Sequence, residues 1–248
     1  MQIAGGSNHT IVATDAGDVY TFGDGSDGQL GNGSFERILQ MYKKLPPSTT
    51  EAPSPPSSHS PVHVRDLATR IIHVAAGSKS SACLDTNGNV YTWGYEGRIK
   101  RHPIEKIISE QPKEDEQQLH VTRLGLGPPE IMVAGDVAGL RISEAEWSKR
   151  TNSRPRLVQI SIDRPFIKFL SCGSDHTLCV SRDGDTYSWG LGEFGQLGHG
   201  TISNADYPQI IDSLCGLGAS NVACGSKHSI VVTVMGEAFS FGFGGNGR

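Results

Sequence analysis

The sequence LSCGSDHTLCVSRDGDTYSWGLGEFGQLGHG spans residues 170–200 and contains the pattern that decides the fold. It holds three boxes in order: Gly-Ser-x-His-Thr, Gly-x-x-Tyr-Ser-Trp-Gly and Gly-x-x-Gly-Gln-Leu-Gly-x-Gly. β-Branched and aromatic residues on either side of an Asp-Gly turn are typical of a β-hairpin. The stretch therefore predicts a strand, a tight turn at Gly184 and a second strand.

The same pattern occurs four times along the chain. The glycines that open the first box are Gly6, Gly77, Gly173 and Gly225. The glycines that close the second box, always 17 residues later, are Gly23, Gly94, Gly190 and Gly242. The third residue after the opening glycine is a histidine in three copies, namely His9, His176 and His228. Because no residue is inserted or deleted between these positions, each copy is interpreted as one repeated β unit.

Two stretches interrupt the array. The opening glycines are separated by 71, 96 and 52 residues, so two of the gaps are longer than the third. The first insertion, residues 34–65, is rich in Pro and Ser and is predicted to be disordered. The second, residues 98–153, lies between repeats two and three. Residues 1–248 are expected to form a single domain, since such arrays tolerate insertions between their repeats.

These three boxes at fixed spacing resemble the regulator-of-chromosome-condensation (RCC) repeat, and copies one and three are nearest to its full pattern. The resemblance implies an all-β fold, a β-propeller that has seven blades in the parent family. This chain would then supply about three and a half to four blades, a partial ring with two long insertions. Kelch repeats have a similar period but are ranked second, because their boxes differ in order and content.

Composition narrows the class of protein. Gly accounts for 31 of 248 residues, as expected of many tight turns. The five cysteines lack Cys-x-x-Cys spacing, which favours a reduced setting in the cytoplasm or nucleus. No apolar run is long enough to cross a membrane, and the N-terminus does not read as a signal peptide.

Several motifs that suggest chemistry are better interpreted as structural. Gly23-x-Gly25-x-x-Gly28 matches the dinucleotide fingerprint, but no helix pattern follows it, so no cofactor is expected. The three repeat histidines occupy equivalent places in different blades, so they are expected to bond a neighbouring turn and not to share a metal. With no convergent nucleophile and base, covalent catalysis is not expected.

The resemblance implies a functional role for one residue. In the exchange factor that names the family, an Asp just before the box histidine contributes to nucleotide exchange on a small GTPase, and Asp175 stands in that place here. The other copies have Asn8, Lys79 and Lys227 there, and an ordinary turn Asp is the alternative.

The resemblance therefore implies a protein-interaction propeller, with guanine-nucleotide exchange on a small GTPase as its sharper form. The alternative is a non-catalytic propeller that recruits substrates or scaffolds a larger protein, such as a ubiquitin ligase or a ciliary protein. A chromatin contact would also suit the family, but the net charge of −4 gives it no support.

Overall fold

The computed structural model describes residues 1–33, 57–95, 151–160 and 164–245, which form four antiparallel sheets and one short 3-10 helix, η1 (Asp212–Leu214). The first sheet contains β1 (Gln2–Gly5), β2 (His9–Ala13), β3 (Val19–Asp24) and β4 (Ser57–His63). The second contains β5 (Ile71–Ala76), β6 (Ser80–Asp85), β7 (Val90–Tyr95) and β8 (Thr151–Val158). The third contains β9 (Ile167–Cys172), β10 (His176–Ser181), β11 (Thr186–Gly190) and β12 (Ala205–Ile210). The fourth contains β13 (Ala219–Cys224), β14 (His228–Thr233) and β15 (Ala238–Gly242).

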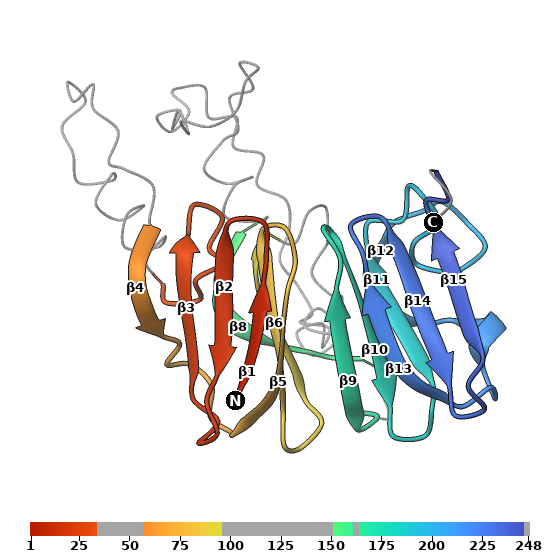
Figure 1. Cartoon of the computed structure of the whole chain (residues 1–248), viewed down its shortest axis with the longest axis horizontal. Coiled ribbons are helices and arrows are strands. Elements are labelled where there is room, and N and C mark those ends of the chain that lie inside the picture. Colours follow the sequence, from red (N-terminus) through yellow and green to blue (C-terminus); the bar gives the residue numbers. More distant parts are fainter. Residues whose placement is uncertain (34–56, 96–150, 161–163, 246–248) are drawn as a thin grey trace, which may run out of the picture.

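Each sheet is a blade in which strands follow one another in chain order. The first strands of consecutive blades contact each other, β1 with β5, β5 with β9 and β9 with β13. These strands therefore line a common axis, and the blades fan out from it, with β4 and β15 at opposite sides of the view (Figure 1). The architecture is that of a β-propeller, and the all-β prediction is confirmed.

The hairpin predicted from the sequence forms in every copy. The residue three places after the opening glycine pairs with the closing glycine of the second box: His9 with Gly23, Ser80 with Gly94, His176 with Gly190 and His228 with Gly242. Each turn contains an Asp or Thr and a Gly that adopts positive φ, such as Gly184 at +91°. The fixed spacing of the boxes is therefore the spacing of one register-locked hairpin.

The predicted bounds of both insertions extend too far at their C-terminal ends. Residues 57–63, placed inside the disordered segment 34–65, form β4 and pair with β3. Residues 151–153, placed inside the insertion 98–153, begin β8, which pairs with β7. The physical reason is that an outermost strand needs only backbone hydrogen bonds and tolerates Pro and polar residues. The predictions for 34–56 and 98–150 lie outside the described residues.

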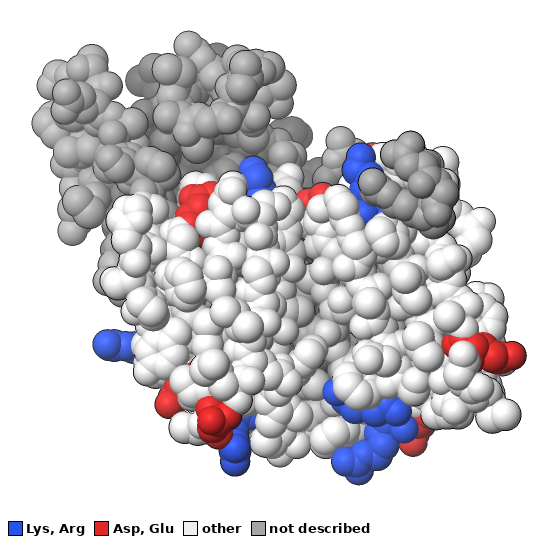
Figure 2. All heavy atoms as spheres, in the orientation of Figure 1, with Lys and Arg blue, Asp and Glu red and all other residues white. Residues whose placement is uncertain are grey.

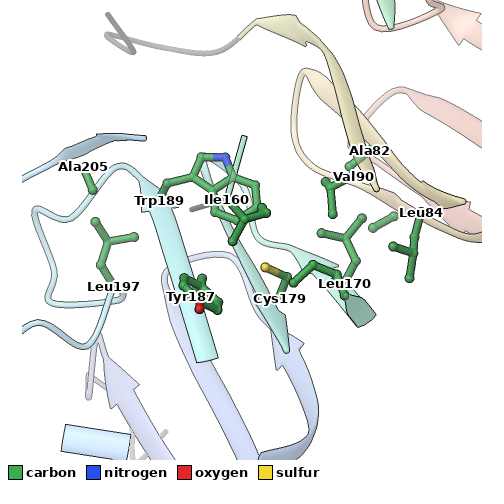
Figure 3. Close-up of a cluster of buried hydrophobic side chains, with 12 residues drawn as sticks. Ala82, Leu84, Val90, Ile160, Leu170, Cys179, Tyr187, Trp189, Leu197 and Ala205 are labelled. Carbon is green, nitrogen blue, oxygen red and sulfur yellow. The ribbon is translucent and has the colours of Figure 1, made fainter. Parts of the chain in front are cut away.

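The hydrophobic core lies between the blades. One cluster joins blades one and two through Ile11, Val74 and Trp93, and another joins blades three and four through Leu178 and Val231. The middle cluster joins blades two and three, where Ala82, Leu84 and Val90 lie near Leu170, Cys179 and Tyr187 (Figure 3). Each blade therefore depends on its neighbours to bury its faces.

Replacing the closing glycine of a blade is expected to destabilise the fold. Gly190 has φ +107°, and a Cβ there would lie 2.5 Å from the carbonyl oxygen of Asp175. Gly190→Ala should lower the free energy of unfolding by at least about 1–2 kcal/mol, measured by urea denaturation. Gly5→Ala is the control, because a Cβ at Gly5 meets nothing within 4 Å. Equal stability of the two variants would contradict the interpretation.

Candidate partner-binding face

The loops between the first and second strands of the blades place four equivalent side chains on one rim of the propeller, the upper rim in Figure 1. These residues are Asn8, Lys79, Asp175 and Lys227. Each of their carbonyl oxygens accepts a hydrogen bond from the N–H that follows the closing glycine, with N···O distances of 2.8–2.9 Å. The hairpin therefore fixes the backbone of each rim residue, and only the side chain differs between blades.

Hydrogen bonds also join consecutive rim loops to one another. The hydroxyls of Ser7 and Ser78 lie 3.1 Å apart, and those of Ser174 and Ser226 lie 2.8 Å apart. The N–H of Ser78 donates to the carbonyl of Ser174 at 2.9 Å. The four loops thus form a continuous belt near the axis, which holds the backbones of the rim residues at fixed positions relative to one another.

Asp175, the site residue predicted from the resemblance, lies on this rim with its side chain exposed to solvent. Partial desolvation raises the pKa of its carboxyl, and the positive charges of Lys79 and Lys227 oppose that rise. Because these lysines occupy the equivalent positions of the two adjacent blades, the carboxylate lies between two ammonium groups. The rim therefore presents alternating charge to a partner.

Aromatic rings and a buried carboxylate lie beside these lysines. The Lys227 Nζ is 4.3 Å from the centroid of Phe194, and Phe194 makes an edge contact with Phe243 at 5.6 Å. The Lys79 Nζ is 3.3 Å from an Asp27 carboxylate oxygen and 5.8 Å from the ring of Tyr95. Asp27 and Phe194 occupy the same repeat position, so in blades one and three the loop after the third strand reaches the lysine of the following blade. Sequence reasoning missed these neighbours.

The repeat histidines lie below this rim, between blades. The Nε2 atoms of His9 and His176 are each 2.9 Å from a serine hydroxyl of the following blade, Ser81 and Ser229. The expected partner was a neighbouring turn, whereas the observed partner is a residue of a strand. The sequence does contain a signal for it, since a Ser or Thr stands four residues after every opening glycine.

The same serine hydroxyls bond the third box of the preceding blade. Ser81 Oγ donates to the carbonyl of Gln29 at 2.9 Å, and Ser229 Oγ donates to that of Gln196 at 2.8 Å. Since a hydroxyl has one proton, each serine must accept its second bond from the histidine Nε2–H. We call each set of His, Ser and Gln a seam clasp: His9, Ser81 and Gln29, and His176, Ser229 and Gln196.

The seam clasps contain a Ser–His pair but are not built for catalysis. Ser81 and Ser229 are almost fully buried, and their protons are committed to a carbonyl oxygen. The Nδ1 atoms of His9 and His176 are buried with no hydrogen-bond partner. Burial lowers the pKa of His176 to about 4 and also lowers that of His9. These histidines are therefore neutral seam residues at neutral pH.

The described residues contain no group of three or more His, Cys, Asp or Glu side chains that could hold a metal ion. The thiols of Cys83 and Cys179 are fully buried, and burial raises the pKa of Cys172 to about 11 and that of Cys224 to about 12. These thiols are therefore protonated at neutral pH. Within the same residues, no helix is long and apolar enough to cross a membrane.

Comparison with known sequences identifies the class of this propeller. Two sequence models of the regulator of chromosome condensation (RCC1) repeat match the chain, one over residues 16–84 and 183–232 and the other over 2–29, 71–98 and 167–196. The matched segments cover the hairpins of the first three blades and most of β14 in the fourth. The chain belongs to the RCC1 repeat family.

Its relatives include much longer proteins. The human E3 ubiquitin-protein ligase HERC2 is 28% identical over 98% of this chain and 4% of its own length. The human X-linked retinitis pigmentosa GTPase regulator is 27% identical over 98% of this chain and 23% of its own length. The human RCC1 domain-containing protein 1 is 28% identical over 94% of this chain and 56% of its own length. The chain thus spans only part of the relatives that it resembles.

Solved structures give the same fold. Human WBSCR16 superposes with a TM-score of 0.62 at 20% identity, covering 98% of this chain and 47% of that protein. Prp20p of Saccharomyces cerevisiae superposes with a TM-score of 0.59 at 20% identity, covering 93% and 42%. The Prp20p structure was described together with its binding to Gsp1p and histones. At this identity the likeness shows the propeller fold.

Breaking one seam clasp should destabilise the whole array. Ser229→Ala would leave the His176 Nε2–H and the Gln196 carbonyl without their shared partner in a buried seam. We expect the free energy of unfolding to fall by about 1–3 kcal/mol in urea denaturation. Ser203→Ala, at an exposed serine, should change it by less than about 0.5 kcal/mol. Equal losses from the two variants would contradict the role of the clasp.

The same seam should make stability depend on pH. Because the folded pKa of His176 is about 4 against 6.5 for the free side chain, the unfolded chain binds the proton first. The contribution of His176 is therefore complete above pH 6.5 and is lost as the pH falls towards 4. The stability advantage of the natural chain over His176→Gln should shrink across this window by up to about 3 kcal/mol. A constant difference between the two proteins in pH-dependent urea denaturation would be evidence against this assignment.

Proposed function

We propose that this chain is a protein-interaction propeller that binds a small GTPase through the rim around Asp175 and accelerates release of its nucleotide. The observation that carries the proposal is the exposed carboxylate of Asp175, placed between Lys79 and Lys227 on a backbone that hydrogen bonds hold in place. Such a surface recognises polar groups on a partner without a covalent step.

The rim can act on a nucleotide site only through differential affinity. A propeller that binds the nucleotide-free GTPase more tightly than the loaded form shifts the GTPase towards the free form and speeds exchange. The carboxylate of Asp175 would engage polar groups near the nucleotide site, while the lysines and the Phe194 and Phe243 rings would supply the surrounding contacts. The serine belt already holds the rim loops, so little conformational freedom of these loops would be lost on binding.

Two comparisons support a GTPase as the partner. One relative is a GTPase regulator by name, and the structural neighbour Prp20p was studied for binding to Gsp1p and histones.

The five cysteines of the chain are unpaired, and we propose a cytoplasmic or nuclear location, where thiols stay reduced.

A second candidate function is recruitment of substrates to a ligase. It is favoured by the similarity to the E3 ligases HERC2 and HERC5, which this chain matches over 4% and 18% of their lengths. In that case the rim would bind a protein substrate, and no GTPase would respond. The two functions therefore differ in a single measurable reaction.

Nucleotide release from a panel of small GTPases distinguishes them. The natural chain should accelerate the release of labelled GDP from one member, and Asp175→Ala should reduce that acceleration by at least about 10-fold, since it removes a charged contact. Asp183→Ala is the matched control, because Asp183 is an exposed turn residue of the same blade and lies at the opposite end of β10.

The exchange proposal would be overturned by a panel in which no GTPase responds. An acceleration that is unaffected by Asp175→Ala would instead place the binding surface elsewhere on the propeller. Tight binding of a non-GTPase protein that is lost in Asp175→Ala, together with no exchange on any GTPase, would establish the recruiting function on the same rim.

A further inference from the structure

The two lysines of the rim differ in the residue that meets them from the preceding blade. Lys79 faces Asp27, and Lys227 faces Phe194. Asp27 and Phe194 each stand four residues after a closing glycine, and the N–H of each donates to a glutamine Oε1 two residues further on at 2.8 Å. The two loops therefore share this backbone hydrogen bond, and they differ in the side chain that meets the lysine.

The positive charge of Lys79 is compensated within the protein. Its Nζ lies 3.3 Å from a carboxylate oxygen of Asp27, whose side chain is only 6% exposed. Burial raises the pKa of the Asp27 carboxyl, and the charge of Lys79 opposes that rise. An anion of a partner that drew Lys79 away would leave a nearly buried carboxylate without its cation, which is unfavourable. Lys79 and Asp27 therefore behave as a neutral pair towards a partner.

The positive charge of Lys227 has no such counter-charge beside it. Its Nζ lies 4.3 Å from the centroid of the Phe194 ring, which attracts a cation without neutralising it. Among the residues that the structure describes, Lys227 forms no ion pair, since neither Asp175 nor Glu193 lies within 4.0 Å of its Nζ. The Lys227 ammonium is therefore the rim cation that is available to an anion.

The accessibility of Lys227 is a property of its repeat position. Lys79 and Asp175 each have a described blade on either side, and both are exposed, as Lys227 is. Acidic and basic side chains are interspersed along the upper rim in Figure 2. Phe194 also makes an edge contact with Phe243, so an apolar surface adjoins the ammonium group. The rim thus combines an uncompensated cation with two aromatic rings.

We propose that Lys227 is the anion-recognising residue of the rim, and that the partner presents to it an acidic side chain next to an apolar one that packs on Phe194 and Phe243. The inference rests on the proposed function in one respect, namely that a protein partner binds at this rim. A carboxylate complements an exposed ammonium group, and an adjoining apolar side chain makes use of the rings. Asp175 would meet a hydrogen-bond donor of the same partner.

Peptide display tests this assignment without a known partner. A library of random short peptides is selected on the natural chain, and the selected peptides should be enriched in Asp or Glu next to an apolar residue. Lys227→Gln should weaken their binding by at least about 10-fold, because it removes a charge-assisted hydrogen bond. Lys79→Gln, the matched control at the equivalent position, should weaken it by less than about 3-fold.

Substitutions in the preceding blades test the cause of the difference. Phe194→Asp places a carboxylate beside Lys227, as Asp27 lies beside Lys79, and should weaken peptide binding by at least about 10-fold although the lysine is still present. Phe194→Asn, which removes the ring without adding a charge, should weaken binding less. Circular dichroism and urea unfolding show whether each variant is folded.

Removing the counter-charge of Lys79 tests the neutral pair. A fresh selection on Asp27→Asn should yield acidic peptides whose binding falls when Lys79→Gln is added, because the second ammonium group is then available. Acidic peptides that bind Asp27→Asn independently of Lys79 would contradict the pair.

Three further results would overturn the inference: selected peptides without enrichment in Asp and Glu, equal losses from Lys227→Gln and Lys79→Gln, or equal losses from Phe194→Asp and Phe194→Asn. Its failure is distinct from failure of the exchange function. Acidic peptides that require Lys227, with no GTPase responding in the panel, would support this inference and remove the exchange function. GDP release that Asp175→Ala impairs and Lys227→Gln leaves unchanged would do the reverse.

Discussion

The propeller depends on a single serine proton in each seam clasp. A blade cannot bury both of its faces alone, so polar groups at the seam must find their partners in the next blade. The hydroxyl of Ser229 donates to Gln196 and so must accept from His176. This order fixes the histidine tautomer, and it gives the seam a direction: the histidine always belongs to the preceding blade and the serine to the following one.

The seam between blades two and three shows what replaces the clasp where the histidine is missing. Ser80 stands in the place of the histidine, and the hydroxyl of Thr177 lies 3.6 Å from the Cys172 sulfur of its own blade. This seam instead contains the largest apolar cluster, including Trp189 and Leu170 (Figure 3). Burial of apolar area can thus substitute for a buried polar network, since an incomplete network would cost more than none.

Sequence alone could predict what depends on local spacing. The hairpins and the place of Asp175 on a loop follow from boxes that never shift in register. The outermost strand β4 could not be predicted, because Ser57–His63 has no alternation and little apolar content, and its stability comes from backbone bonds to β3. The serine partners of His9 and His176 lie more than 50 residues away, so the repeat position marks a Ser or Thr but only the blade arrangement shows that it meets a histidine. Asp175 was singled out by resemblance, and no spacing rule distinguishes it from Asn8.

The residues that join the blades are different from the rim residues that a partner can contact, and this separation explains how such a repeat can bind a partner. The histidine and glutamine of each seam clasp come from copies one and three and are the same in both, whereas the adjacent rim position holds Asn, Lys, Asp and Lys in turn. A change on the rim alters charge without removing a seam clasp, because only the backbone of each rim residue takes part in the hairpin. Since the belt fixes the loops that carry these side chains before a partner arrives, the rim gains specificity at a smaller entropic cost. The Ser–His pairs that could suggest catalysis lie sealed in the seam, and the groups that a partner can reach are those of a binding surface.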